Sequence, residues 1–158
     1  MGQATIVNST SCLYSKIAKS ADTSRTATTT LSADPDLQFP MVASAKYWIR
    51  LAVFFDTTAA ADFKWRHNGP ASPTLVRLLR RWIIPGGTAE AGIAVDTAFS
   101  AADLSVVGTG TTGGTVTLEG VVTNGLNAGT FSFSWAQNTS DAGNTIVRAG
   151  STLEYMKL

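Results

Sequence analysis

The strongest constraint on the fold is an aromatic alternation near the C-terminus. Phe131, Phe133 and Trp135 are separated by single serines. Successive side chains of a strand point to opposite faces, so these three rings share one face, whereas at about 100° per residue a helix would scatter them. Residues 130–136 are therefore predicted to form a β-strand whose aromatic side faces a core.

Other segments repeat this two-residue period. Large apolar and polar side chains alternate over residues 45–55, 62–68 and 115–123, and an Asn-Gly hairpin signal stands at 124–125. A turn cluster at 140–144 leads into residues 145–148 and a last predicted strand at 152–156. Short strands joined by Gly, Asn and Asp turns are typical of a two-sheet β-sandwich or a small barrel.

Residues 74–83 fit two structures. Leu75, Leu78, Leu79 and Trp82 recur at helical spacing with arginines opposite them, and prolines bracket the segment. We predict a strand because the surrounding sequence is β, with a helix as the alternative.

The first thirty residues differ from the rest. Residues 1–30 are mostly Ser, Thr and Ala with isolated apolar side chains, and we predict an extended N-terminal arm there and a β-sandwich domain at 31–158. Residues 26–31 are rich in β-branched side chains and are expected to pair onto a sheet edge, whereas the part before them has too little apolar area to order itself. A disordered leader and an arm that orders against another subunit or protein both remain open.

Charge and residue counts exclude several functional classes. The 158 residues include 12 Lys and Arg against 11 Asp and Glu, and a net charge of +1 gives no strong attraction to a nucleic acid. One Cys excludes an internal disulfide framework, and one His removes most imidazole-based chemistry. We therefore expect no cofactor, no metal site and no direct nucleic-acid partner.

No membrane or export element is expected either. The apolar stretch at 48–55 contains Arg50 and is far shorter than the ~20 residues of a spanning helix. Residues 1–13 lack the basic start and apolar run of a signal peptide. The chain is expected to be made in a cytoplasm and to remain soluble.

Three sequence features that could indicate catalysis or ligand binding have simpler structural interpretations. Residues 108–113 spell G-x-G-x-x-G, but a β-branched strand follows instead of the helix that binds a pyrophosphate, so we predict a Gly/Thr loop. His67 is predicted to be a strand-end or loop histidine, and Asp34-Pro35-Asp36 a turn. Carboxylate pairs suited to glycoside hydrolysis are expected only by chance, so we predict that the protein is not an enzyme.

The most concentrated charge lies beside a tryptophan. Arg77, Arg80 and Arg81 precede Trp82, and Arg and Trp are enriched at binding hot spots. An interface and an ordinary solvated face are both open interpretations of this segment.

The C-terminal sequence carries a longer pattern. Residues 128–141 read AGTFSFSWAQNTSD, and 147–153 close with G-S-x-L. This resembles a C-terminal signature of small tailed-bacteriophage virion structural proteins. Residues 30–40 and 62–71 are also similar, so the resemblance covers about residues 28–158, and Trp135-Ala136-Gln137-Asn138 is its most specific part.

The resemblance implies a non-enzymatic virion component with a jelly-roll-like two-sheet β-sandwich, often trimeric. We favour a capsid decoration (cement) protein that binds the major capsid protein lattice on the outer capsid surface and stabilises the shell. Little sequence follows the signature's close and the arm is long, which favours this role. The host bacterial cytoplasm is then the place of synthesis. The expected partners are further copies of the chain, as a homotrimer, and the major capsid protein.

The alternative is a receptor- or carbohydrate-binding module of a tail, collar or head fibre. Trp48, Trp65 and Trp82 would then be stacking platforms, although core packing is the competing interpretation. For either role, the candidate subunit or capsid interface residues are Leu13, Tyr14, Lys16, Ile17, Lys19, Arg77, Arg80, Arg81 and Trp82.

Overall fold

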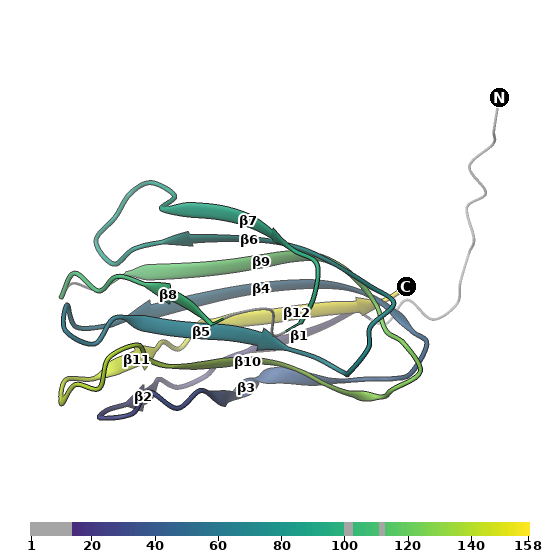
Figure 1. Cartoon of the computed structure of the whole chain (residues 1–158), viewed down its shortest axis with the longest axis horizontal. Helices are drawn as coiled ribbons and strands as arrows, with labels where there is room; N and C mark the ends of the chain where they lie inside the picture. Colours follow the sequence, from purple (N-terminus) through teal and green to yellow (C-terminus); the bar gives the residue numbers. More distant parts are fainter. Residues whose placement is uncertain (1–13, 100–102, 111–112) are drawn as a thin grey trace.

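The computed structural model describes residues 14–99, 103–110 and 113–158, which form two antiparallel β-sheets packed face to face (Figure 1). The predicted all-β, two-sheet sandwich is confirmed. No helix long and apolar enough to cross a membrane occurs in these ranges. The large sheet contains β1 (Tyr14–Ala18), β2 (Thr23–Arg25), β4 (Lys46–Asp56), β6 (Leu75–Ile83), β7 (Gly92–Asp96), β9 (Gly114–Thr123), β11 (Thr145–Val147) and β12 (Thr152–Lys157); the small sheet contains β3 (Ser32–Met41), β5 (Phe63–Asn68), β8 (Leu104–Val106) and β10 (Gly129–Gln137).

In both sheets, strands that are far apart in the sequence lie next to each other. The large sheet has the order β1-β12-β4-β9-β6-β7, with β11 paired to β2 and β4, and the small sheet has the order β3-β10-β5-β8. Thus β9 lies between β4 and β6, and β10 lies between β3 and β5. Each sheet therefore contains strands from both halves of the chain.

The predicted aromatic strand lies at the centre of the core. Phe131, Phe133 and Trp135 on β10 are all fully buried. Trp65 on β5 lies 5.7 Å from the Phe133 ring, and Phe63 stacks 4.0 Å from Phe55 of the large sheet. The first contact lies within the small sheet and the second joins the inner faces of the two sheets, so the aromatic side of β10 faces the core, as the sequence alternation predicted.

The ambiguous segment is a strand. Residues 75–83 pair with β9 on one side and β7 on the other, so the strand prediction for 74–83 is confirmed. Alternate residues share a face in a strand, so the side chains of this segment are grouped differently from the helical pattern. Leu78, Arg80 and Trp82 share one face of β6, while Arg77 and Arg81 share the opposite face.

The N-terminal predictions need correction. Residues 26–31 form no strand, so the predicted edge pairing there is wrong; the edge strands come earlier, as β1 paired with β12 and β2 paired with β11. The expectation that the sequence before residue 26 cannot order is wrong from Tyr14 onward. Ile17 packs against the core, and the backbone of Lys19 is hydrogen-bonded to Gly150 and Ser151, which supplies the missing stabilisation. The part of the predicted arm before Tyr14 lies outside the described residues.

The predicted Asp34-Pro35-Asp36 turn is also wrong. These residues lie inside β3, at a shift in its register with β10 between Ser132 and Ser134. Asp34 Oδ1 accepts the backbone N–H of Asp36 at 3.1 Å and of Leu37 at 3.3 Å, which is turn-like hydrogen bonding within a β-bulge. Pro35 has no N–H to donate to a neighbouring strand and is suited to this position.

Candidate interaction face

Side chains on the large sheet that point away from the small sheet form a broad surface, here called the outer face. Six neighbouring strands contribute to it, and their register aligns its residues in rows across the sheet. We name two of these rows. The apolar row consists of Tyr14, Met156, Trp48 and Val121 and ends at Arg77 on β6. The charged row consists of Lys16, Glu154, Arg50 and Glu119 and continues into Leu79 and Val95.

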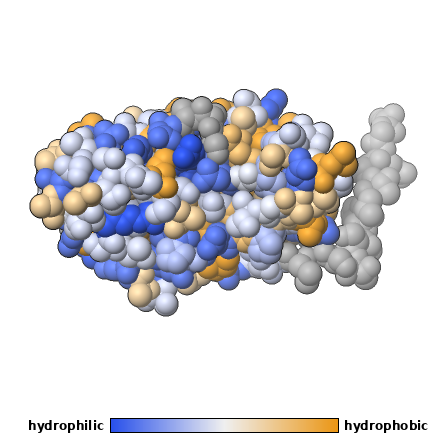
Figure 2. Space-filling view, turned by 60° about the horizontal axis from the view of Figure 1, so that its bottom comes forward, coloured by the Kyte–Doolittle hydropathy of each residue, from blue (hydrophilic) through white to orange (hydrophobic). Residues whose placement is uncertain are grey.

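Several large apolar side chains on the outer face are exposed to solvent. Tyr14 on β1 is 55% exposed, and Val95 and Ile93 on the edge strand β7 are 59% and 56% exposed. Trp48 is half-buried between Met156 and Val121. In the view of Figure 2, hydrophobic residues of the molecule form small groups separated by hydrophilic ones. The outer face thus carries both apolar and charged side chains.

The charged row alternates in sign over four strands. Lys16, Glu154, Arg50 and Glu119 follow one another from β1 to β9. Lys16 Nζ lies 3.5 Å from a Glu154 carboxylate oxygen, and partial burial together with Glu154 raises the pKa of the Tyr14 hydroxyl. Arg77 and Arg81 add positive charge on β6, so cations outnumber carboxylates on this face.

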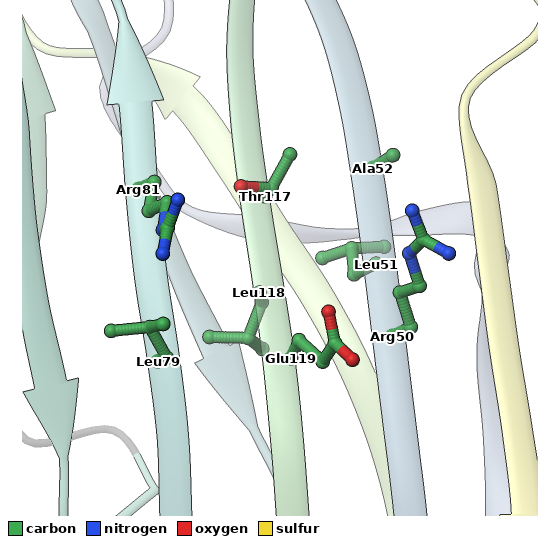
Figure 3. A pocket seen from close by; sticks show the side chains of 8 residues that line it. All are labelled: Arg50, Leu51, Ala52, Leu79, Arg81, Thr117, Leu118 and Glu119. Carbon is green, nitrogen blue, oxygen red and sulfur yellow. The ribbon is translucent and has the colours of Figure 1, made fainter. Parts of the chain in front are cut away.

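A hollow of about 250 Å³ lies on this surface. Figure 3 shows its lining side chains on the adjacent strands β6, β9 and β4. Two guanidinium groups and one carboxylate supply its charges, and Arg81 also pairs with Glu90 at 3.2 Å. Small-molecule pockets usually measure about 300–1,000 Å³, so this hollow is smaller than a typical ligand pocket. Its lining residues are Arg50, Leu51, Ala52, Leu79, Arg81, Thr117, Leu118 and Glu119.

The structure places four predicted interface residues on the outer face. Tyr14 and Lys16 come from β1, and Arg77 and Arg81 come from β6, so segments about sixty positions apart share one surface. No local pattern in the sequence indicates that these strands belong to one sheet. Met156, Glu119 and Val95 were not predicted, and Trp48 was named only as a stacking platform for the alternative role. Their place on one surface with the predicted residues becomes recognisable only when the strand order is known.

The other predicted interface residues lie elsewhere. Ile17 and Trp82 pack against the core, and Arg80 pairs with Asp96 on the inner side of β6. Lys19 is only 3% exposed, because its side chain turns into the sandwich, where Asp34 and Asp36 bind it. Lys19 is thus buried, Ile17, Arg80 and Trp82 are partly exposed, and Leu13 lies outside the described residues.

His67 occupies the second-to-last position of β5 and is only 4% exposed. Its Nε2 lies 3.7 Å from Asp96 Oδ2, and Arg80 pairs with the other oxygen of that carboxylate. Burial lowers the pKa of His67, and Asp96 opposes this shift. The imidazole therefore lies beside the Asp96–Arg80 pair inside the sandwich. The predicted strand-end position of His67 is confirmed, whereas its burial in the core was not predicted.

Other chemical motifs have structural roles. Residues 108–110 and 113 belong to a connection that runs from β8 into β9, as the Gly/Thr loop prediction requires, and the Gly108 N–H donates to Asp62 Oδ1 at 2.7 Å. Across the ranges that the structure describes, no group of three His, Cys, Asp or Glu side chains is arranged to hold a metal ion.

Comparisons with known proteins give no family. No family model matches the chain, and no curated protein matches it. Among solved structures, the crystal structure of the VP2 subviral particle of infectious bursal disease virus matches with TM-score 0.25 and 11% identity over 92% of this chain. Structures of the Gx and Gt strains of that virus match with TM-scores of 0.23 and 0.22 and identities of 11% and 12%. This chain spans only 40% to 42% of those chains, and scores at this level carry no argument about function.

Proposed function

We propose that the chain is a non-enzymatic structural protein of a tailed-phage virion, and that it serves as a trimeric capsid decoration protein. Its outer face would contact the major capsid protein lattice at the outer capsid surface and stabilise the shell. The single observation that carries the proposal is the outer face itself, where exposed apolar side chains and alternating charges share one sheet.

The sequence resemblance supports the fold behind this proposal, not its contact surface. Trp135 and Ala136 are fully buried in the core. The Gln137 side chain donates to the Gly143 carbonyl and accepts the N–H groups of Asp141 and Thr28. Trp135, Ala136 and Gln137 thus help to hold the sandwich together, while Asn138 and the two residues after it are exposed.

The outer face can act by contact alone. Burial of apolar side chains yields about 25 cal/mol per Å², and Trp48, Val95 and Ile93 offer such area without unfolding any element. A trimer would repeat this contact around a symmetry axis, so weak contacts from each copy would add through effective concentration. The excess of Arg and Lys on this face favours a partner surface with an excess of carboxylates.

The copy number of the chain in purified virions tests the proposal. A decoration protein covers a lattice, so gel densitometry against the major capsid protein should give hundreds of copies per particle. A count of a few to some dozens would overturn the decoration role and favour a collar, tail or fibre position. Absence of the chain from purified particles would overturn the virion role altogether.

One observation favours a second candidate, a carbohydrate- or receptor-binding module. Trp65 is buried and Trp82 packs against the core, but Trp48 lies on the outer face one row from the Arg50 and Glu119 side chains that line the hollow. A half-buried surface ring beside polar groups is suited to stacking on a sugar. Glycan binding that Trp48→Ala abolishes, together with a low copy number, would support this candidate over decoration.

A further inference from the structure

A buried amine and a buried carboxyl group meet between the two sheets. Lys19, just after β1, places Nζ 3.1 Å from Oδ1 of Asp34 on β3 and 2.7 Å from Oδ2 of Asp36. The side chains of Lys19 and Asp34 are fully buried, while that of Asp36 is 42% exposed. The three groups come from opposite sheets, and the outer face does not use them.

The position of the amine is held from two sides. The Lys19 backbone N–H donates to the Ser151 carbonyl, and the Lys19 carbonyl accepts the Gly150 N–H, both at 2.8 Å. Two reacting groups held in this way behave as if at a very high concentration, with effective molarities of about 10⁵–10⁸ M for well-oriented pairs. The desolvation of two opposite charges in such a site is also unfavourable unless their contacts compensate for it.

The carboxyl group of Asp34 is surrounded by hydrogen-bond donors. Its Oδ1 accepts the N–H groups of Asp36 and Leu37, and its Oδ2 accepts Trp135 Nε1–H at 3.1 Å. Preorganised donors at both oxygens can stabilise the negative charge that develops when a nucleophile adds to the carboxyl carbon. The β-bulge lies where a turn was predicted, and it directs the backbone N–H groups of Asp36 and Leu37 at Oδ1 of Asp34.

We propose that Lys19 and Asp34 condense to form an intramolecular isopeptide bond. The Nζ lone pair adds to Cγ of Asp34 and forms the new C–N bond, with the oxyanion held at Oδ1 by the two backbone N–H groups. The Cγ–Oδ2 bond then breaks. The Nζ lone pair becomes available only after one proton of the Lys19 ammonium has passed by way of Asp36 to Oδ2 of Asp34. Of the three ammonium protons, one therefore remains on the amide nitrogen and two leave with Oδ2 as water. Charge balances, because one cation and one anion become a neutral amide, and nothing is oxidised or reduced.

Asp36 is placed to carry the protons. Its Oδ2 contacts Nζ at 2.7 Å, so it can accept a proton from the nitrogen and release it to the leaving oxygen. Its partial exposure gives the released water a route to solvent. The bond would fasten the end of β1 to β3, and so the large sheet to the small sheet. The inference does not depend on the proposed function.

The intact mass of the folded protein tests the bond directly. After incubation of the purified full chain at neutral pH, denaturing mass spectrometry should show a mass lower than the sequence mass by one water. Trypsin should fail to cleave after Lys19 and should yield a branched peptide that contains Lys19 and Asp34. The full sequence mass for the folded protein overturns the proposal, and this result requires no variant.

Four variants separate the bond from an ordinary ion pair. Asp34→Asn should lose ammonia instead of water, because the amide is also a leaving group after attack. Asp36→Asn should fold, by circular dichroism, yet keep its full mass. Lys16→Met removes the exposed amine on the same strand as a matched control and should still lose one water. Loss of water by a folded Lys19→Met variant would assign the bond to other residues and overturn the proposal.

Discussion

The two faces of the large sheet use neighbouring positions of the same strands for different purposes. Leu118 points inward from β9 and is fully buried, whereas Glu119, the next residue, points outward and is exposed. The same relation holds for Leu51 and Arg50 on β4. The inner face determines whether the chain folds, and the outer face is left free for contact with a partner.

The largest effect is expected at the centre of the inner face. Trp135→Ala removes a fully buried indole that stacks over Phe63 and donates to Asp34, so it should lower the free energy of unfolding by about 3–5 kcal/mol. Equilibrium denaturation with urea measures this loss. A decrease below about 1 kcal/mol, the average for point substitutions, would contradict the position assigned to this ring.

A matched pair on β9 compares the two faces directly. Leu118→Ala should cost about 2–5 kcal/mol of stability because it leaves a cavity between the sheets. Glu119→Ala, one position away, should change stability by no more than about 0.5 kcal/mol, as is usual for surface positions. Similar losses for both variants would show that the outer face is also buried, for example in an oligomer.

The pH dependence of stability tests the buried histidine. Burial lowers the pKa of His67 in the folded protein, so the unfolded chain binds a proton first as the pH falls below about 6.5. Stability is therefore fully present above that pH and should fall below it, with a slope of at most about 1.4 kcal/mol per pH unit for one proton. A His67→Gln variant should lose this slope; retention of the slope would assign it to other groups.

The smallest effect is expected for the ion pair on the outer face. Lys16 and Glu154 are 3.5 Å apart, with the Lys16 side chain 51% exposed, so Lys16→Ala should cost no more than about 1 kcal/mol. Thermal unfolding at low and high salt measures this contribution, which should shrink as salt rises. A larger, salt-independent loss would mean that the pair contributes to the fold like an inner-face residue.

The sequence determined the inner face better than the outer face. The alternation of Phe131, Phe133 and Trp135 and the five large residues of β4 predicted strands and buried sides because each signal is local. Tyr14 and Arg77 share a row only because β12, β4 and β9 lie between them, and strand order is not a local property.

The buried ion cluster was missed for a related reason. Lys19 meets Asp34 across fifteen positions, through a β-bulge and a contact between the sheets. Ser and Thr around Lys19 indicated a polar arm, and nothing in that composition signals a partner on another strand. The polar residues around Lys19 predicted that its side chain is exposed, whereas its ion pairs with Asp34 and Asp36 accompany its burial.

The most direct test of the account is particle binding by an outer-face variant. Arg50→Glu combined with Arg81→Glu reverses two charges at the hollow, while Thr130→Glu adds a charge on the exposed side of β10 in the small sheet. In co-sedimentation with virions stripped of the chain, wild type and Thr130→Glu should bind alike, and the double variant should unfold at the wild-type temperature but lose binding at least tenfold. Wild-type binding by the folded double variant would contradict the central claim that the outer face makes the contact.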